Sequence, residues 1–542
     1  MSSPGLTVIG LDAATPPVVE AMLEAGELPN LARLCASGSR GTLESTLHPL
    51  TPQAWTTMVT GVNAGRHGIW DFSERDESGY RLRIVNGSRR RAPALWDYLG
   101  AKGIRSGLVN IPFTAPAPTI DGFAVAGLDA APRDDALTYP RELAETLRRR
   151  FGELDLDHSF PLDSSGRVDI GIVERAVTQK VEMARWLSEQ YDPQLLFVVF
   201  MSADHIHHLS WPDWEERGLR SRVADVYRVL DGAVGGLADD PDRNVLVVSD
   251  HGGGSLDGVV NLNAWLAREG FLEYASAGTM ATGGEAARHA VFRVDRLRRR
   301  LPRRLRSFAR RRAPKLRDRV HQLRDYSVID WRRTRAFAYG TFGSIVVNLE
   351  GRERFGTVDP SEYDAVRADI AGRLESLTDP DGRPIVGAVY RREELFDGPE
   401  LETMPDLIVE FDDYRWLGKG NMLSRSESLW DSVEIAPGAK ESYVGSHRRE
   451  GLIALSGPSA AQGRTLAASI ADVAPTALYL LDAPIPDDLE GRVLEEAVRP
   501  ELLDERPPAY EAYELERVEG DPAGAVGSPE VEDRLRSLGY LE

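Results

Sequence analysis

The stretch LLFVVFMSADHIHH, residues 195–208, decides the fold. Its first six residues are all apolar, which is typical of a strand buried on both faces of a parallel sheet, and polar residues follow where the strand ends. Helical stretches separate such runs, so the sequence predicts an α/β fold with a mostly parallel central sheet and helices on both faces. Three other runs repeat the arrangement: Thr7–Leu11 before Asp12, Ser106–Val109 before Asn110, and Asn244–Val248 before Asp250 and His251.

The remaining elements follow from the same periodicities. We expect helices at Pro17–Ser37, Ile172–Gln190, Glu216–Ala238, Pro360–Leu377 and Asp472–Leu481. We expect further strands at Ala336–Leu349, Leu407–Phe411 and Leu452–Ser456. We divide the chain into a first part of a catalytic core (1–275), an arginine-rich insertion that forms a lid, cap or surface helix (276–335), a second part of the core (336–500) and an acidic C-terminal tail (501–542).

The composition indicates a globular protein without a nucleic-acid partner. The chain has 542 residues and a formal net charge of −20, and this acidity argues against specific nucleic-acid binding. Cys35 is the one cysteine, so no disulfide can form within the chain, which fits a reducing compartment. The first residues, MSSPGLTVIGLDA, lack the pattern of a signal peptide, and no run of 18 apolar residues occurs. We therefore expect a cytoplasmic protein.

The insertion contains a strongly basic segment, residues 293–324, with fifteen Lys and Arg residues against two acids. Its apolar residues recur every three or four positions, which predicts an amphipathic helix with arginine on the other face. A solvated lid, peripheral contact with an anionic membrane, and steering of a polyanionic substrate are the alternatives for this segment. The apolar residues are Val294, Leu297, Leu301, Leu305 and Phe308.

Carboxylates follow three of the predicted strands. Asp12, Asp204 and Asp250 are expected to converge, because sites in open α/β sheets form at the carboxyl ends of the strands. His208 lies four residues after Asp204 and would share its face of a helix, and His251 follows Asp250 directly. Carboxylates together with imidazoles suit Zn²⁺, Mn²⁺ or Fe rather than Ca²⁺. Two such ions roughly 4 Å apart can clamp both oxygens of a displacement at phosphorus.

Thr51 is the candidate nucleophile. It lies in HPLTPQAWTTMVTG, residues 48–61, directly before Pro52, and proline favours the first position of a helix. We expect Thr51 to be the N-cap of a helix that runs through Trp55 and ends near Gly61. The hydroxyl would then lie where backbone N–H groups and the helix dipole favour an anion. A metal on the same oxygen would lower the pKa of the hydroxyl.

Five separated segments occur in an order that is typical of one family. They resemble the type I phosphodiesterase/nucleotide pyrophosphatase family of the alkaline phosphatase superfamily, over most of residues 5–495 and outside 276–335. The resemblance implies an alkaline-phosphatase-like core with one metal held by Asp204, His208 and His447 and another by Asp12, Thr51, Asp250 and His251. Zinc is the family's usual ion, and its mechanism passes through a phosphothreonine that water hydrolyses. The segments are GLDA, LTPQAWTTMVTG with GRHGIWDF, SADHIHH, SDHGG and VGSHRREG.

The resemblance implies a two-metal hydrolase of phosphodiester or pyrophosphate bonds in small molecules, with Thr51 as the nucleophile. The eukaryotic nucleotide pyrophosphatases carry an asparagine three residues after the nucleophile, where this chain has Ala54. Asn110 is a candidate for the missing substrate-binding donor. A phosphomonoesterase, a phospho-headgroup transferase and a non-catalytic metal-stabilised scaffold remain alternatives on the same core.

Overall fold

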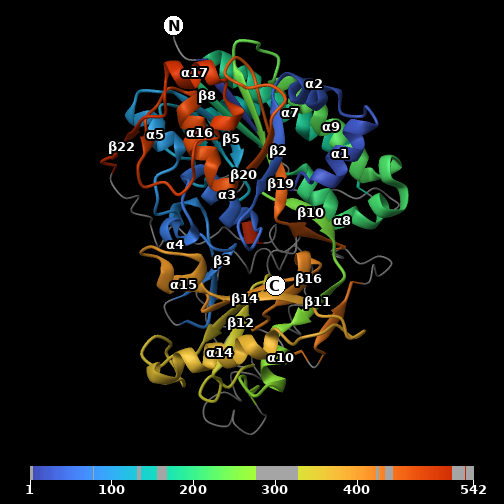
Figure 1. Cartoon of the computed structure of the whole chain (residues 1–542), viewed down its shortest axis with the longest axis vertical. Coiled ribbons are helices and arrows are strands. Elements are labelled where there is room, and N and C mark those ends of the chain that lie inside the picture. Colours follow the sequence, from blue (N-terminus) through green and yellow to red (C-terminus); the bar gives the residue numbers. More distant parts are fainter. Residues whose placement is uncertain are drawn as a thin grey trace.

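A computed structural model describes residues 4–76, 79–130, 136–154, 168–275, 328–422, 425–426, 428–433, 444–515 and 531–532. These residues form a larger lobe, which contains the central sheet, and a smaller lobe below it in Figure 1. Most of the basic insertion, residues 276–327, lies outside the described residues. The prediction of an amphipathic helix at 293–324 therefore stays a prediction.

The central sheet of the larger lobe has the strand order β20-β2-β19-β9-β1-β8-β5-β6-β7 in the described residues. Five neighbouring strands, from β9 to β6, run parallel, while β19 is antiparallel to both of its neighbours and β7 is antiparallel to β6. The mostly parallel sheet predicted from the sequence is confirmed. Its strands are β1 (Leu6–Leu11), β2 (Ser39–Glu44), β5 (Ser106–Ile111), β6 (Gly122–Ala126), β7 (Thr138–Tyr139), β8 (Leu195–Phe200), β9 (Asn244–Val248), β19 (Glu450–Ser456) and β20 (Thr465–Ser469).

Helices cover both faces of this sheet, as predicted. Alternate residues of each strand point to opposite faces, so Val8 and Phe197 belong to one buried cluster and Ile9 and Val198 to the other. The first cluster packs against α3 (Thr51–Thr60), α5 (Leu95–Ala101) and α16 (Val473–Leu480). The second packs against α1 (Pro16–Glu24), α2 (Pro29–Ser37), α6 (Leu143–Phe151), α7 (Ile170–Tyr191) and α9 (Arg222–Leu237).

Two predicted helices are each interrupted at a glycine. The helix predicted at Pro17–Ser37 is two helices, because Gly26 adopts a φ of 72° between α1 and α2. The helix predicted from Glu216 begins only at Arg222, because α8 (Ser202–Arg217) ends at Gly218, which has a φ of 51°. Positive φ is accessible to glycine at little cost, and it ends a right-handed helix.

The smaller lobe has its own buried core and its own sheets. A four-stranded antiparallel sheet has the order β12-β13-β15-β14, and a three-stranded sheet has the order β16-β11-β17. The strands are β11 (Gly258–Asn261), β12 (Ala336–Tyr339), β13 (Ser344–Val347), β14 (Val386–Arg391), β15 (Leu407–Phe411), β16 (Trp416–Lys419) and β17 (Trp430–Ser432). The helices are α10 (Leu262–Arg268), α14 (Tyr363–Leu374) and α15 (Arg392–Leu395).

The predicted domain division stays a prediction. It did not include a separate smaller lobe, which the structure contains. Residues 336–411 contain the strands β12 to β15 and the helices α14 and α15 of the smaller lobe, and the described chain rejoins the central sheet with β19 and β20. Ile329 and Trp331, inside the predicted insertion, are buried in the core of the smaller lobe. In the predicted tail, α17 (Pro500–Glu505) is followed by β22 (Tyr510–Glu511), which pairs with β21 (Ile485–Pro486).

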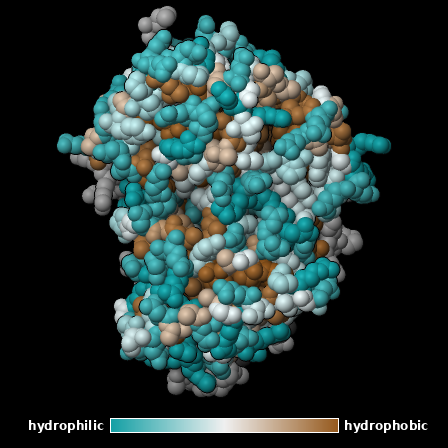
Figure 2. Space-filling model, in the orientation of Figure 1, coloured by the Kyte–Doolittle hydropathy of each residue, from teal (hydrophilic) through white to brown (hydrophobic). Residues whose placement is uncertain are grey.

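The two lobes meet through specific side chains. The hairpin of β3 (Ser73–Arg75) and β4 (Leu82–Ile84) extends from the larger lobe, and Tyr80 at its turn is buried in the core of the smaller lobe. In the other direction, Phe342 and Tyr414 join the buried cluster of the larger lobe. Figure 2 shows apolar side chains between the largely hydrophilic surfaces of the two lobes. The interface is therefore built from both sides.

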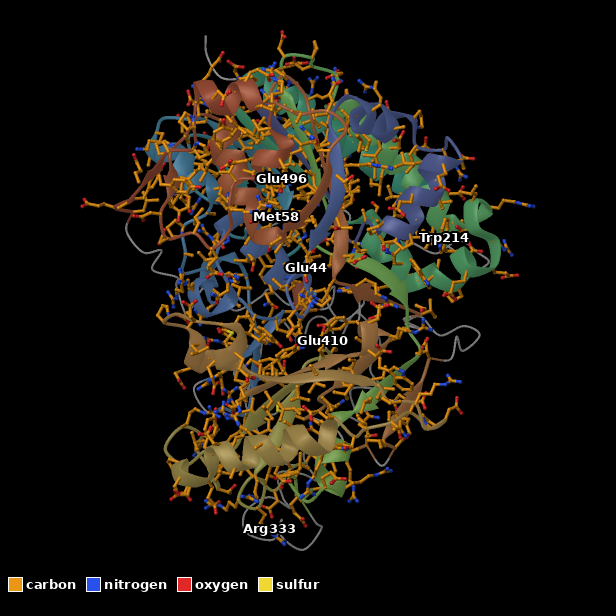
Figure 3. All side chains as sticks on the ribbon, in the orientation of Figure 1. Glu44, Met58, Trp214, Arg333, Glu410 and Glu496 are labelled. Atoms are coloured by element: carbon orange, nitrogen blue, oxygen red, sulfur yellow. The ribbon has the colours of Figure 1, made fainter. Side chains whose placement is uncertain are left out.

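A cleft lined by ion-paired side chains lies between the two lobes. Figure 3 places Glu44, at the end of β2, and Glu410, on β15, on facing sides of it, and Arg449 pairs with both carboxylates. The cleft has a volume of about 540 Å³ and is lined by residues of both lobes. Among the described residues, no helix has the length and apolar character that crossing a bilayer requires.

Candidate metal centre

The three predicted carboxylates follow the carboxyl ends of three strands of the central sheet. Asp12 follows β1, Asp204 lies in the first turn of α8 after β8, and Asp250 follows β9. Because β9, β1 and β8 are neighbours and parallel, their carboxyl ends bring these residues together. All three side chains are fully buried.

Asp204, His208 and His447 form one cluster. Oδ1 of Asp204 lies 3.2 Å from Nε2 of His208 and 3.3 Å from Nε2 of His447, and these two nitrogens are 2.9 Å apart. Asp204 and His208 share a face of α8, as their spacing predicted. His447 arrives from β18 (Gly445–Arg448), which pairs with β10 (Gly252–Ser255) so that His447 lies opposite Gly253.

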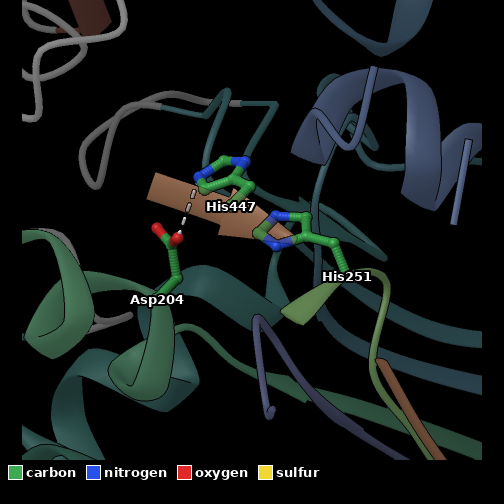
Figure 4. Close-up of side chains that lie close together, drawn as sticks. All are labelled: Asp204, His251 and His447. Carbon is green, nitrogen blue, oxygen red and sulfur yellow. Dashed lines mark ion pairs between the residues drawn. The ribbon is translucent and has the colours of Figure 1, made fainter. Parts of the chain in front are cut away.

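Asp12, Asp250 and His251 form a second cluster that adjoins the first. Nε2 of His251 lies 3.3 Å from Oδ2 of Asp250 and 3.8 Å from Oδ1 of Asp12. The His251 ring stacks on the His447 ring with a centroid distance of 3.9 Å. Figure 4 shows this contact together with Asp204, and the ligand atoms of Asp204, His251 and His447 also lie within 4.8 Å of one another. His251 therefore links the two clusters.

All three imidazoles are turned so that Nε2 faces the clusters. Nδ1 of His208 donates to the carbonyl of Gly445 at 3.0 Å, and Nδ1 of His251 donates to the carbonyl of Gly252 at 3.0 Å. Nδ1 of His447 donates to the carbonyl of Pro49. A carbonyl only accepts, so the ring hydrogen sits on Nδ1 and a neutral ring presents the lone pair of Nε2. Such outer hydrogen bonds fix the tautomer of histidines that ligate metals.

Asp12 and Asp250 each have one oxygen anchored by a hydrogen bond and one oxygen that faces Nε2 of His251. Oδ2 of Asp12 accepts a hydrogen bond of 2.7 Å from Nε1 of Trp55, and Oδ1 of Asp250 accepts one of 3.2 Å from the Ala13 amide. Oδ1 of Asp12 and Oδ2 of Asp250 are buried and accept no hydrogen bond from the described residues. Buried polar atoms in proteins are normally paired, so these two oxygens fit a cation.

The electrostatics favour a positive charge between these groups. Burial, together with the charges of Asp250 and Asp204, raises the pKa of Asp12 well above its usual range. Burial likewise raises the pKa of Asp250. Burial also opposes ionisation of Asp204, but the neighbouring His208 and His447 hold the pKa of this carboxyl well below its usual range. Divalent cations would stabilise the ionised carboxylates, and the mixed oxygen and nitrogen donors fit a transition metal.

The Thr51 hydroxyl lies beside these clusters, at the N-terminus of α3. Its Oγ1 is 3.5 Å from Nε2 of His251, and the side chain is fully buried. The prediction that Thr51 is the N-cap is wrong by one residue, because Leu50 is the N-cap and Thr51 is the first residue of α3. The carbonyl of Leu50 already accepts the helical hydrogen bond from Ala54. The helix ends before Gly61, as predicted.

Asn110 lies at the end of β5 with a φ of 60°, and its Nδ2 donates to the carbonyl of Val199. Its role in substrate binding stays a prediction.

Trp55 was predicted only as part of the helix, and in the structure it is the hydrogen-bond partner of Asp12. The sequence holds a signal for this contact, since Trp55 lies four residues after Thr51 and therefore on the same face of α3.

Comparisons with known proteins identify the family of the chain and proteins that share its fold. The sequence profile of the type I phosphodiesterase / nucleotide pyrophosphatase family matches residues 6–429. Two structures of phosphonoacetate hydrolase from Sinorhizobium meliloti 1021, in complex with phosphonoformate and with phosphonoacetate, share the fold with TM-scores of 0.52 and 0.53. Their sequences are 14% and 15% identical to this one, and each alignment covers 89% of this chain and 95% of that chain. No curated protein matches the sequence.

Fold and profile together define a phosphoester hydrolase of the alkaline phosphatase superfamily. Within it, the chain belongs to the type I phosphodiesterase/nucleotide pyrophosphatase family, as the five sequence segments predicted.

Proposed function

We propose that the protein hydrolyses phosphodiester or pyrophosphate bonds of small molecules with two divalent metal ions and a phosphothreonine intermediate on Thr51. The observation that carries the proposal is the position of the Thr51 hydroxyl. It lies at the N-terminus of α3, 3.5 Å from Nε2 of His251, beside two buried clusters of carboxylates and imidazoles.

We assign the candidate ligands to the two ions from the contacts among them. Asp204, His208 and His447 would hold one ion, and Asp12, Asp250 and His251 would hold the other together with Thr51. Zinc fits this donor set, and Mn²⁺ or Fe would fit it as well. Such ions activate the nucleophile and neutralise charge on the oxygens at phosphorus.

The protein's own groups complete the reaction. Oγ1 of Thr51 forms a bond to phosphorus while the bond from phosphorus to the leaving oxygen breaks, and the leaving group departs with a proton. Water then attacks phosphorus, the bond to Oγ1 breaks, and Thr51 regains its proton. The backbone N–H of Gln53 lies in the first turn of α3 and therefore has no hydrogen-bond acceptor within the helix. Such N–H groups at a helix N-terminus favour an anionic phosphoryl group.

The test compares Thr51→Ala and Thr51→Ser with the control Thr60→Ala. Thr60 lies on the same helix and is equally buried, but its hydroxyl donates to the carbonyl of Thr56. Thr51→Ala should lower the rate of chemistry by several orders of magnitude, Thr51→Ser should retain part of it, and the control should keep it. Acid-quenched protein should carry the substrate's phosphoryl group on the peptide that contains Thr51, together with the retained ester group where the substrate is a diester or a pyrophosphate. A Thr51→Ala protein with the parent rate would show that water attacks phosphorus directly.

The substrate is sought among dinucleotides, nucleotides, phospholipid headgroups and chromogenic monoesters and diesters. Ala54 stands where the nucleotide pyrophosphatases carry an asparagine, so nucleotides are not favoured over other esters. A higher kcat/KM for diesters than for monoesters supports the proposed bond specificity, and the reverse order supports a phosphomonoesterase.

A further inference from the structure

His207 lies next to the candidate ligand His208 but belongs to neither of the two clusters of candidate ligands. Its ring is buried between two aromatic side chains, with centroid distances of 5.8 Å to Tyr227 on α9 and 5.1 Å to Trp211 on α8. The proposed function assigns no role to His207 or to Tyr227.

A chain of two hydrogen bonds connects these residues to the loop after β1. The backbone N–H of Thr15 donates to Oη of Tyr227 at 3.0 Å, and the Tyr227 hydroxyl lies 3.2 Å from Nε2 of His207. Because the amide can only donate, the Tyr227 oxygen accepts from it and the phenolic hydrogen is available to Nε2 of His207. Thr15 follows Asp12 by three residues, so Tyr227 ties the loop of Asp12 to the helix of Asp204 and His208.

His207 also contacts the ribbon of β10 and β18. A Cβ atom on Gly253 would collide with Nδ1 of His207, and one on Gly445 would collide with its backbone carbonyl. Gly253 lies opposite His447 and two residues after His251, while the carbonyl of Gly445 accepts from Nδ1 of His208. Glycine at both positions lets the ribbon come close to His207.

We propose that His207 and Tyr227 are positioning residues that set the spacing between the two clusters of candidate metal ligands. Through them, the loop of Asp12, the helix of Asp204 and the ribbon that carries His251 and His447 contact one buried pair of side chains. The inference rests on the proposed function, because it takes these residues as the metal ligands.

The first test is Tyr227→Phe, which removes one hydroxyl and leaves the Thr15 amide and Nε2 of His207 without partners. The matched control is Tyr80→Phe. Tyr80 is also buried, its hydroxyl also accepts from a backbone amide, that of Phe355, and it donates to Asn348 in the smaller lobe. Both variants should lose stability, but Tyr227→Phe alone should weaken Zn²⁺ binding, by about tenfold, since one hydrogen bond of this kind is removed at the centre.

Zinc affinity is measured by competition with a chromophoric chelator, well below the unfolding temperature, so that loss of stability alone does not change it. Equal zinc affinities for the two variants would overturn the positioning role. A parent protein that binds no zinc, manganese or iron would instead overturn the proposed metal centre itself.

The second test keeps the inference decidable if Tyr227→Phe does not fold. Gly253→Ala should weaken zinc binding because its methyl group collides with His207. In a protein that already carries His207→Ala, the Gly253→Ala change should reduce zinc affinity by a factor at least severalfold smaller, because the colliding ring is absent. Equal losses of affinity in both backgrounds would contradict a role for His207.

Discussion

Replacement of Trp55 by phenylalanine tests how the metal centre is held. Nε1 of Trp55 donates a hydrogen bond of 2.7 Å to Oδ2 of Asp12, and both side chains are fully buried. The replacement removes this donor and keeps an aromatic ring in the core. Oδ1 of Asp12, which faces the cluster, then loses the anchor that fixes the carboxylate.

The size of the effect follows from the kind of hydrogen bond. A hydrogen bond to a charged group contributes about 1.5–3 kcal/mol, and about 1.4 kcal/mol corresponds to a tenfold change in an equilibrium constant. We therefore expect Trp55→Phe to weaken zinc binding by roughly tenfold to a hundredfold, in the range found for other outer partners of metal ligands. The loss should fall on the ion that we propose Asp12 holds rather than on the one proposed for Asp204.

The assay is a two-site zinc titration against a chelator, with Trp96→Phe as the control. Trp96 is buried in the same cluster as Trp55, but its Nε1 has no hydrogen-bond partner among the described residues. Both variants replace a buried indole by a phenyl ring, so comparison with the control separates the effect of the lost packing on zinc affinity from that of the lost hydrogen bond. If Trp55→Phe and Trp96→Phe bind both zinc ions equally well, the Trp55 hydrogen bond does not hold the centre.

Three further predictions concern other parts of the chain. Asp250→Asn should lose metal and activity together, because an amide is a poor ligand for a divalent ion. The control Asp257→Asn, which changes an exposed ion pair with Arg415, should keep both. An unchanged metal content in Asp250→Asn would exclude Asp250 as a metal ligand. Burial raises the pKa of Asp71 to about 7 from 3.8, so its contribution to stability is complete below pH 4 and is lost as the pH rises through 7. Urea unfolding should therefore show that Asp71→Asn gains stability over the parent as the pH rises from 4 to 8, and a constant difference would contradict this. Deletion of residues 293–324 should reduce cosedimentation with anionic vesicles at low salt, and equal pelleting of parent and deletion would eliminate membrane contact.

Local sequence patterns predicted the main sheet and most of the centre. Four apolar runs with polar ends located β1, β5, β8 and β9, and Asp12, Asp204 and Asp250 follow from the rule for carboxyl ends of parallel strands. His208 follows from the helical repeat. These features depend on residues near one another in the chain, where periodicity carries the information.

Other features depend on contacts between distant segments. His447 reaches the centre because β18 pairs with β10, and nothing in its own neighbourhood indicates that pairing. The strands at 336–411 were predicted as part of the core, since an apolar strand has the same local pattern in either lobe. The single-residue error at Thr51 reflects the uncertainty of helix ends, where the proline signal fits both of the first positions.

The pairing of β10 with β18 also brings together the two ends of the segment that carries most of the smaller lobe. The ribbon ends at Ser255 and resumes at Gly445, so residues 256–444 stand in the sequence between two paired strands. The entropy of closing such a segment grows only with the logarithm of its length, about 0.6 kcal/mol for each doubling. The smaller lobe also has a buried core of its own. A lobe of another size or shape grafted between the same two strands should therefore keep His447 opposite Gly253, provided that it also buries Tyr80 and replaces the contacts of Phe342 and Tyr414.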